Sequence, residues 1–159
     1  MNELSAEQNQ NNESKALPFE VGRGWTAMPN AAITVYSKHP SYNTTAIVLY
    51  NRLLNYYSTN YGYAYPTRAR LAIDLGMSVE SVKRAIKALK EMELIDVKRN
   101  YQFNNNNYYF LQPVETVEEL KQKFPQHIAK IEKKEAEILA ILQMEENDKQ
   151  RFETFKKAN

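Results

Sequence analysis

The basic and small polar side chains between residues 78 and 90 have the types and spacing that nucleic-acid binding requires. On a helix, which turns by 100° per residue, Val82, Ala85, Ile86 and Leu89 share one side and Lys83, Arg84 and Lys87 lie opposite. Side chains near the start of such a helix reach base edges, and Lys or Arg pairs with phosphate. We therefore expect base-edge contacts from Val79, Glu80, Ser81 and Arg84, and phosphate contacts from Lys83, Lys87 and Lys90.

Two helices joined by a glycine turn must position these side chains. The first is predicted to begin after Thr67 and to end at Gly76, because glycine readily takes the left-handed conformation at a helix end. Ser78 is then the predicted N-cap of the second helix, which runs to about Glu93. Free N–H groups at that N-terminus suit phosphate. Arg68 and Arg70, at the start of the first helix, are further phosphate-binding candidates, with an ordinary solvated arginine as the alternative for either.

A β-hairpin is predicted directly after the second helix. Residues 94–98 and 108–111 read as strands, and the polar segment between them suits a hairpin tip. Lys98 and Arg99 lie at the base of this wing, where they can reach DNA. The tip carries Asn104, Asn105 and Asn106, which either contact the DNA or form a turn without contacts.

The segments before the motif are less regular. Residues 1–17 are polar and predict a disordered tail. A short strand is expected near Ile33–Tyr36, and a helix with an apolar face is expected from Thr44. Tyr61, Tyr63 and Tyr65 lie in the loop before the motif, where core packing is favoured over stacking on single-stranded bases.

The last third of the chain predicts helices. Thr116 and Glu119 have the spacing of a capping box, and a longer helix is expected from about Gln126 to beyond Met144. Its apolar residues at heptad positions form either a dimer seam or a face packed on this chain's own winged domain: Ile128, Ile131, Ile138 and Leu142.

Composition and charge exclude several classes of protein. Without cysteine, a disulfide scaffold, a thiol nucleophile and a Cys-based zinc site are excluded. Residues 16–113 carry 11 Lys and Arg against 6 Asp and Glu, whereas the two flanking segments are slightly acidic. His39 and His127 have no metal-ligand or triad spacing, so neither an enzyme, a metal nor a cofactor is expected. No apolar run is long enough to cross a bilayer, so we expect a cytoplasmic protein.

The stretch PTRARLAIDLGMSVESVKRAIKALKEMELIDVKR, residues 66–99, followed by NNNNYYFL, resembles the winged helix-turn-helix of bacterial plasmid replication initiators and phage replisome-organiser proteins. The preceding AIVLYNRLLNYY fits the same layout, and the resemblance covers about residues 30–112. It implies binding to double-stranded DNA and contact with other replication proteins. Val79 and Glu80 depart from the small polar or basic residues that relatives often carry there. Glu80 either accepts from a cytosine amino group or marks a module that binds protein.

The sequence thus predicts an α+β, mostly α, winged helix-turn-helix with a C-terminal helical extension. The expected parts are the tail over 1–17, the DNA-binding domain over 18–113, and the extension over 114–159, which binds a second copy or another partner. The predicted function is sequence-specific duplex binding by a plasmid- or phage-type replication initiation or maintenance protein. The alternatives are a transcriptional repressor with the same domain and a protein-interaction module that does not bind DNA.

Overall fold

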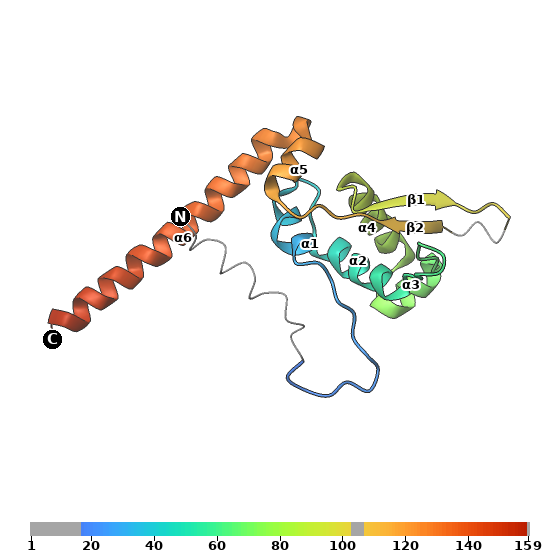
Figure 1. Ribbon diagram of the computed structural model, residues 1–159, viewed down its shortest axis with the longest axis horizontal. Helices are drawn as coiled ribbons and strands as arrows, with labels where there is room; N and C mark the ends of the chain where they lie inside the picture. The colour runs from blue at the N-terminus through green and yellow to red at the C-terminus, as the bar shows by residue number, and fades with distance from the viewer. Residues whose placement is uncertain (1–16, 103–106, 159) are drawn as a thin grey trace.

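Three helices form the body of the domain in the computed structural model, which describes residues 17–102 and 107–158. α2 (Thr44–Tyr56), α3 (Arg68–Leu75) and α4 (Val79–Glu91) pack on one another (Figure 1). The helix predicted from Thr44 is confirmed, and the Asn43 carboxamide caps it by accepting from the Ala46 N–H at 2.7 Å. The predicted tail over residues 1–17 falls, except for Leu17, outside the described residues.

The wing follows α4 as an antiparallel hairpin of β1 (Ile95–Arg99) and β2 (Asn107–Leu111), as predicted. In its register Val97 faces Tyr109 and Arg99 faces Asn107. A further segment joins β2 at one position, because Ala64 and Tyr109 exchange backbone hydrogen bonds of 2.9 and 2.8 Å. The loop between α2 and α3 therefore lies along the hairpin, where its tyrosines approach the wing.

The strand predicted near Ile33–Tyr36 is absent from this part of the described chain. Instead α1 (Ala31–Thr34) leads into the 3₁₀ helix η2 (Tyr36–Lys38). The β-branched residues here favour a strand locally. Packing decides otherwise, because the helical turns bury Ala31, Ala32, Val35 and Tyr36 in the core.

The C-terminal extension begins with α5 (Val117–Lys123), whose predicted capping box is confirmed. The 3₁₀ helix η3 (Pro125–His127) then leads into α6 (Ile128–Ala158). Leu120, Phe124 and Ile131 are buried with the core of the winged domain. Figure 1 shows the rest of α6 projecting away from that domain.

Together these elements are a mostly helical winged helix-turn-helix with a hairpin wing and a long C-terminal helix. Across residues 17–102 and 107–158, every helix is too short or too polar to span a membrane.

Candidate nucleic-acid interface

Three capping residues fix the start of α3, the end of α3 and the start of α4. The Thr67 hydroxyl accepts from the Arg70 N–H at 3.0 Å, and the Ser78 hydroxyl accepts from the Ser81 N–H at 3.1 Å. Between them Gly76 has φ 62° and ψ 35°, the left-handed conformation predicted for it. The capped N-terminus of α4 is therefore held beside the end of α3.

α4 divides its residues between core and solvent as the helical periodicity predicts. Val82, Ala85, Ile86 and Leu89 are buried. The opposite side is exposed at Val79, Glu80, Lys83, Arg84, Lys87 and Lys90, and Ser81 is half-buried. The residues expected to contact DNA from α4 thus lie together on one accessible helix face.

The first turn of α4 carries an internal ion pair. The Lys83 ammonium lies 2.6 Å from a Glu80 carboxylate oxygen, and this hydrogen bond lowers the pKa of Glu80. Ser81 accepts a hydrogen bond from Arg84 at 3.3 Å, and its hydroxyl lies 3.0 Å from that of Ser78. Glu80 is therefore ionised and can only accept hydrogen bonds, with its charge partly balanced by Lys83.

A basic cleft of 290 Å³ lies between α4, the start of α3 and the wing. Its lining brings together four cations with two apolar residues and one amide: Arg68, Lys83, Lys90, Arg99, Ile86, Val97 and Asn107. This described lining contains no carboxylate. Four of the cations expected to contact DNA therefore converge from three elements on one concavity.

Strand alternation separates the two cations expected at the base of the wing. Arg99 and its cross-strand partner Asn107 face the basic cleft, together with Val97. Lys98 points to the opposite face of the hairpin, where its ammonium lies 5.0 Å from the centre of the Phe110 ring. Asn104, Asn105 and Asn106 lie outside the described residues.

Arg70 belongs to a network between α2 and α3 rather than to the basic cleft. Its guanidinium is 3.2 Å from Asp74, which also receives hydrogen bonds from Arg52 at 2.9 Å and from the Tyr56 hydroxyl at 2.6 Å. These hydrogen bonds, that of Tyr56 foremost, lower the pKa of Asp74. Arg70 thus has a structural partner, although its side chain remains largely exposed.

The structure also shows what sequence patterns missed around the site. Val97 and Ile86 form the apolar part of the cleft lining, and Asn107 belongs to β2 rather than to the tip. Alternation along two paired strands was the signal that could have placed Val97, Arg99 and Asn107 on one face. Nothing local in the sequence indicates that Ala64 pairs with Tyr109 of β2.

The two histidines meet although they are distant in sequence. Their ring centres are 5.2 Å apart, and His39 also packs edge-on against Phe124 at 4.5 Å. Burial first, and then His127, lowers the pKa of His39 to about 4. The described residues hold no cluster of three or more His, Cys, Asp or Glu suited to a metal ion.

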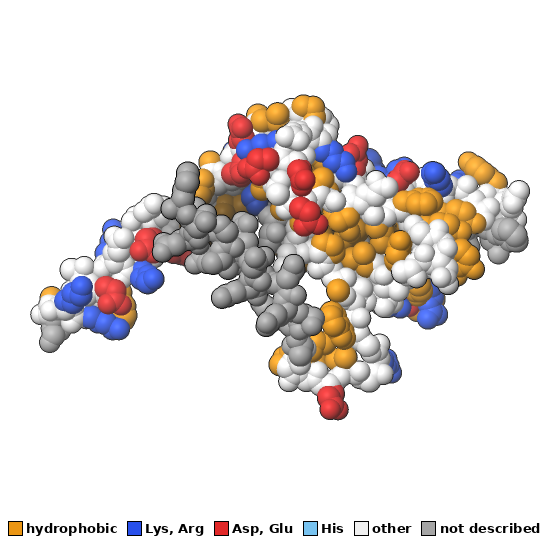
Figure 2. Space-filling view, in the orientation of Figure 1, with side chains coloured by type: hydrophobic (Ala, Val, Ile, Leu, Met, Phe, Trp, Pro, Cys, Tyr) orange, Lys and Arg blue, Asp and Glu red, His pale blue; other side chains and the backbone are white. Residues whose placement is uncertain are grey.

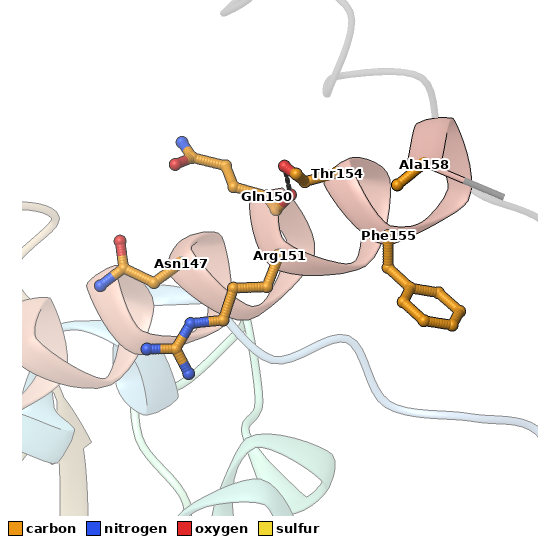
Figure 3. A pocket seen from close by; sticks show the side chains of 6 residues that line it. All are labelled: Asn147, Gln150, Arg151, Thr154, Phe155 and Ala158. Carbon is orange, nitrogen blue, oxygen red and sulfur yellow. Dashed lines mark hydrogen bonds between the residues drawn. The ribbon is translucent and has the colours of Figure 1, made fainter.

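A hollow of 580 Å³ on the far part of α6 is separate from the basic cleft. Figure 3 shows its described lining, which comes from α6 alone: Asn147, Gln150, Arg151, Thr154, Phe155 and Ala158. The Thr154 hydroxyl donates to the Gln150 carbonyl at 2.9 Å, which is an ordinary hydrogen bond within a helix. Side chains of one helix give this hollow no convergent polar groups comparable to those of the basic cleft.

The residues expected in a dimer seam have different surroundings. Ile131 is fully buried in this chain's own core, and α6 contacts η2, so Ile131 is not available to a second copy. Ile128 is 36% exposed, Ile138 is half-buried, and Leu142 is 53% exposed. The first turns of α6 thus pack on their own domain, and the apolar stripe is accessible only further along the helix.

Comparison with known proteins agrees with the local geometry. Residues 43–95 match a family model described as a helix-turn-helix domain. No curated protein matches the chain. Among solved structures, a possible transcriptional regulator from Methanosarcina mazei is 17% identical, with 60% of this chain and 78% of that chain covered and a TM-score of 0.40.

Two further similar structures come from Lactococcus lactis and Streptococcus pyogenes. ZitR from Lactococcus lactis, a zinc-responsive MarR family member, is 19% identical over 92% of this chain and 91% of its own, with a TM-score of 0.35. The adhesin competence repressor AdcR from Streptococcus pyogenes is 19% identical, with 76% of this chain and 84% of that chain covered and a TM-score of 0.34. The capped helices α3 and α4 with their glycine turn, and the similarity of residues 43–95 to the family model, identify this segment as a helix-turn-helix.

Proposed function

We propose that this chain binds duplex DNA site-specifically, with α4 in the major groove and a phosphate backbone along the basic cleft. The observation that carries the proposal is the convergence of Arg68, Lys83, Lys90 and Arg99 on that cleft. Cations held at one concavity neutralise neighbouring phosphates and release their counterions, which supplies most of the affinity.

The exposed first turns of α4 supply the base contacts in this proposal. Val79, Glu80, Ser81 and Arg84 face the floor of the groove, and Lys87 reaches a phosphate on its other side. The Glu80 carboxylate accepts from a cytosine amino group, while its pair with Lys83 limits repulsion from phosphate. Ser78 presents the N-terminus of α4 to a phosphate oxygen.

Regulation of transcription is the cellular role that we propose first. A protein that acts only by occupying its site represses when that site overlaps a promoter. Replication initiation is the second candidate, favoured by the resemblance of residues 66–99 and requiring a further replication protein as partner. Footprinting discriminates them, because a repressor protects a promoter and an initiator protects an origin. Both roles place the protein in the cytoplasm.

A second copy of the chain is the partner that we propose for the exposed part of α6. Ile138 and Leu142 continue the apolar stripe beyond the winged domain, with Leu139 and Ile141 beside them. A dimer through this stripe presents two α4 helices to half-sites separated by about 34 Å, one turn of DNA.

Duplex binding is tested by titrating a labelled mixed-sequence duplex at about 50 and 200 mM salt. The variant Lys83→Ala/Lys90→Ala/Arg99→Ala removes three cations from the basic cleft. The matched control Lys133→Ala/Lys149→Ala/Lys157→Ala removes the same charge from exposed positions on α6.

We expect affinity to fall steeply with salt for the native chain and the control, and to be much weaker with a shallower slope for the cleft variant. Equal losses in the two variants would show that net charge, not the basic cleft, governs binding. No binding even at low salt would instead support a protein-interaction module.

A further inference from the structure

The wing has a second face, which the basic cleft does not use. Because side chains alternate along paired strands, Lys98, Tyr108 and Phe110 point away from the cleft. Tyr63 lies against them, with its ring centre 4.4 Å from that of Tyr108 and 5.5 Å from that of Phe110. These rings come from two segments that pair at Ala64 and Tyr109.

Tyr61 and Tyr65 complete this group, the outer aromatic face: Tyr61, Tyr63, Tyr65, Tyr108 and Phe110. Tyr61 stacks on Tyr63 at 5.8 Å with 24° between the ring planes, and Tyr63 stacks on Tyr108 with 27° between planes. Tyr61 is 60% exposed and Tyr65 49% exposed, so the column of rings ends in solvent. Figure 2 shows hydrophobic side chains, tyrosine included, gathered over the wing end of the molecule.

Charge around these rings favours an anionic partner. The sequence contains no Asp or Glu from Val21 to Ile73, a stretch with five cations, and none from Val97 to Val114. On the outer side of the hairpin, Lys98 stands over Phe110. Asp96 is the carboxylate in the strands on this side, and one of its oxygens accepts from the Val97 N–H at 2.9 Å.

We propose that the outer aromatic face binds unpaired bases of single-stranded DNA, which stack on Tyr61 and Tyr65 while Lys98 pairs with the phosphate chain. Rings with accessible faces stack on any base, so this site needs no base-specific hydrogen bonds. The faces of one hairpin would then contact different forms of DNA, the duplex at the basic cleft and an unpaired strand opposite. The inference does not depend on duplex binding, since the two surfaces share no residue.

The test is fluorescence anisotropy with the full chain and a labelled thymidine oligonucleotide of about 16 nucleotides, which fits single-strand site sizes. An abasic oligonucleotide of the same length keeps the phosphates but has no base to stack. We expect the native chain to bind the thymidine strand at least tenfold more tightly than the abasic strand.

The variant Tyr61→Leu/Tyr65→Leu keeps apolar bulk and removes the two exposed rings. We expect it to lose at least tenfold in affinity for the thymidine strand and to keep a cooperative urea unfolding transition, which shows that it is folded. Phe152→Leu, which removes an exposed ring from α6, is the matched control and should bind as the native chain does.

Three results would overturn the proposal. One is the absence of single-strand binding by the native chain at about 50 mM salt, which would leave the rings to a protein partner. Another is equal affinity for thymidine and abasic strands. The third is unchanged thymidine affinity in the tyrosine variant. The cleft variant Lys83→Ala/Lys90→Ala/Arg99→Ala separates the two sites, because it should lose duplex affinity but still bind the thymidine strand more tightly than the abasic strand.

Discussion

Gly76 takes a left-handed backbone conformation at the end of α3, in the turn that leads into α4. A Cβ at this position would meet no atom within 4 Å, so replacement by alanine costs only the backbone strain of φ +62°. We expect Gly76→Ala to lower the free energy of unfolding by about 1–2 kcal/mol. Urea unfolding measures this, and Gly22→Ala is the control, because Gly22 has equally open surroundings without the positive φ. Equal losses in both variants would contradict the conformational explanation.

His39 makes stability depend on pH in a window that its shifted pKa defines. Its pKa falls from 6.5 in the unfolded chain to about 4 in the fold, so between these values the unfolded chain binds more protons. The contribution of His39 to the free energy of unfolding is therefore fully present above about pH 6.5 and is lost as the pH falls towards 4. His127 and Glu91 act on the same ring in opposite directions.

The variant His39→Asn tests this prediction. Its carboxamide oxygen can replace Nδ1, which accepts from the Ser41 N–H at 3.1 Å, but it does not titrate. We expect lower stability at pH 7, from lost ring packing on Phe124, with a flatter decline between pH 6.5 and pH 4. Urea unfolding at several pH values checks this, and an unchanged decline in the variant would assign the pH dependence to other groups.

At the residue scale, the sequence predicts helix caps and the glycine turn better than it predicts side-chain contacts between distant residues. Caps and the glycine turn depend on neighbours along the chain, so Ser78, Thr67 and Gly76 could be placed from their spacing. The Arg70–Asp74 pair has the i,i+4 spacing that a helix brings together, but the contacts of both residues with Tyr56 of α2 have no local signal. The same holds for the two histidines.

At the scale of the elements, the N-caps of α4 and α5 are chemically alike but differ in their proposed roles. Ser78 caps α4 and Thr116 caps α5, each through a side-chain oxygen that accepts a backbone N–H. Loss of either hydroxyl should lower the free energy of unfolding by about 1 kcal/mol. In the proposed complex only Ser78 lies at the DNA.

We therefore expect Ser78→Ala to weaken both stability and duplex binding, and Thr116→Ala to weaken stability alone. Urea unfolding combined with the duplex titration separates these effects. If Thr116→Ala weakened duplex binding as strongly, loss of the α4 cap would act only through general destabilisation.

Most elements followed from periodicity, and the failures have a common cause. α2, α3, α4 and the hairpin have strong local patterns that agree with their packing. The segment Ile33–Tyr36 has strand propensity but becomes helical, and its helical turns bury Val35 and Tyr36 in the core. The pairing of Ala64 with Tyr109 spans the helix-turn-helix, so no short-range pattern predicts the outer aromatic face.

At the scale of the molecule, the proposed dimer predicts a change of mass. We expect the native chain to be dimeric and Leu142→Lys to make it monomeric, because the charge would be buried in the apolar seam. Ala140→Lys is the matched control, since Ala140 is exposed and lies about 160° away around α6. Light scattering after size-exclusion chromatography measures the mass of each. A monomeric native chain, or a dimeric Leu142→Lys, would contradict the proposed seam.

The burial of Ile131 has a mechanical consequence for the molecule. Ile131 anchors α6 in the core, and α6 contacts η2. About 27 residues, roughly 40 Å of helix, extend beyond this buried residue. A tilt of about 10° at the anchor would swing the far end by about 7 Å. Force applied near Phe152 would in turn act as torque on η2 and on the helices behind it. A partner bound at the C-terminal end of α6 would therefore transmit force through the helix to the winged helix-turn-helix.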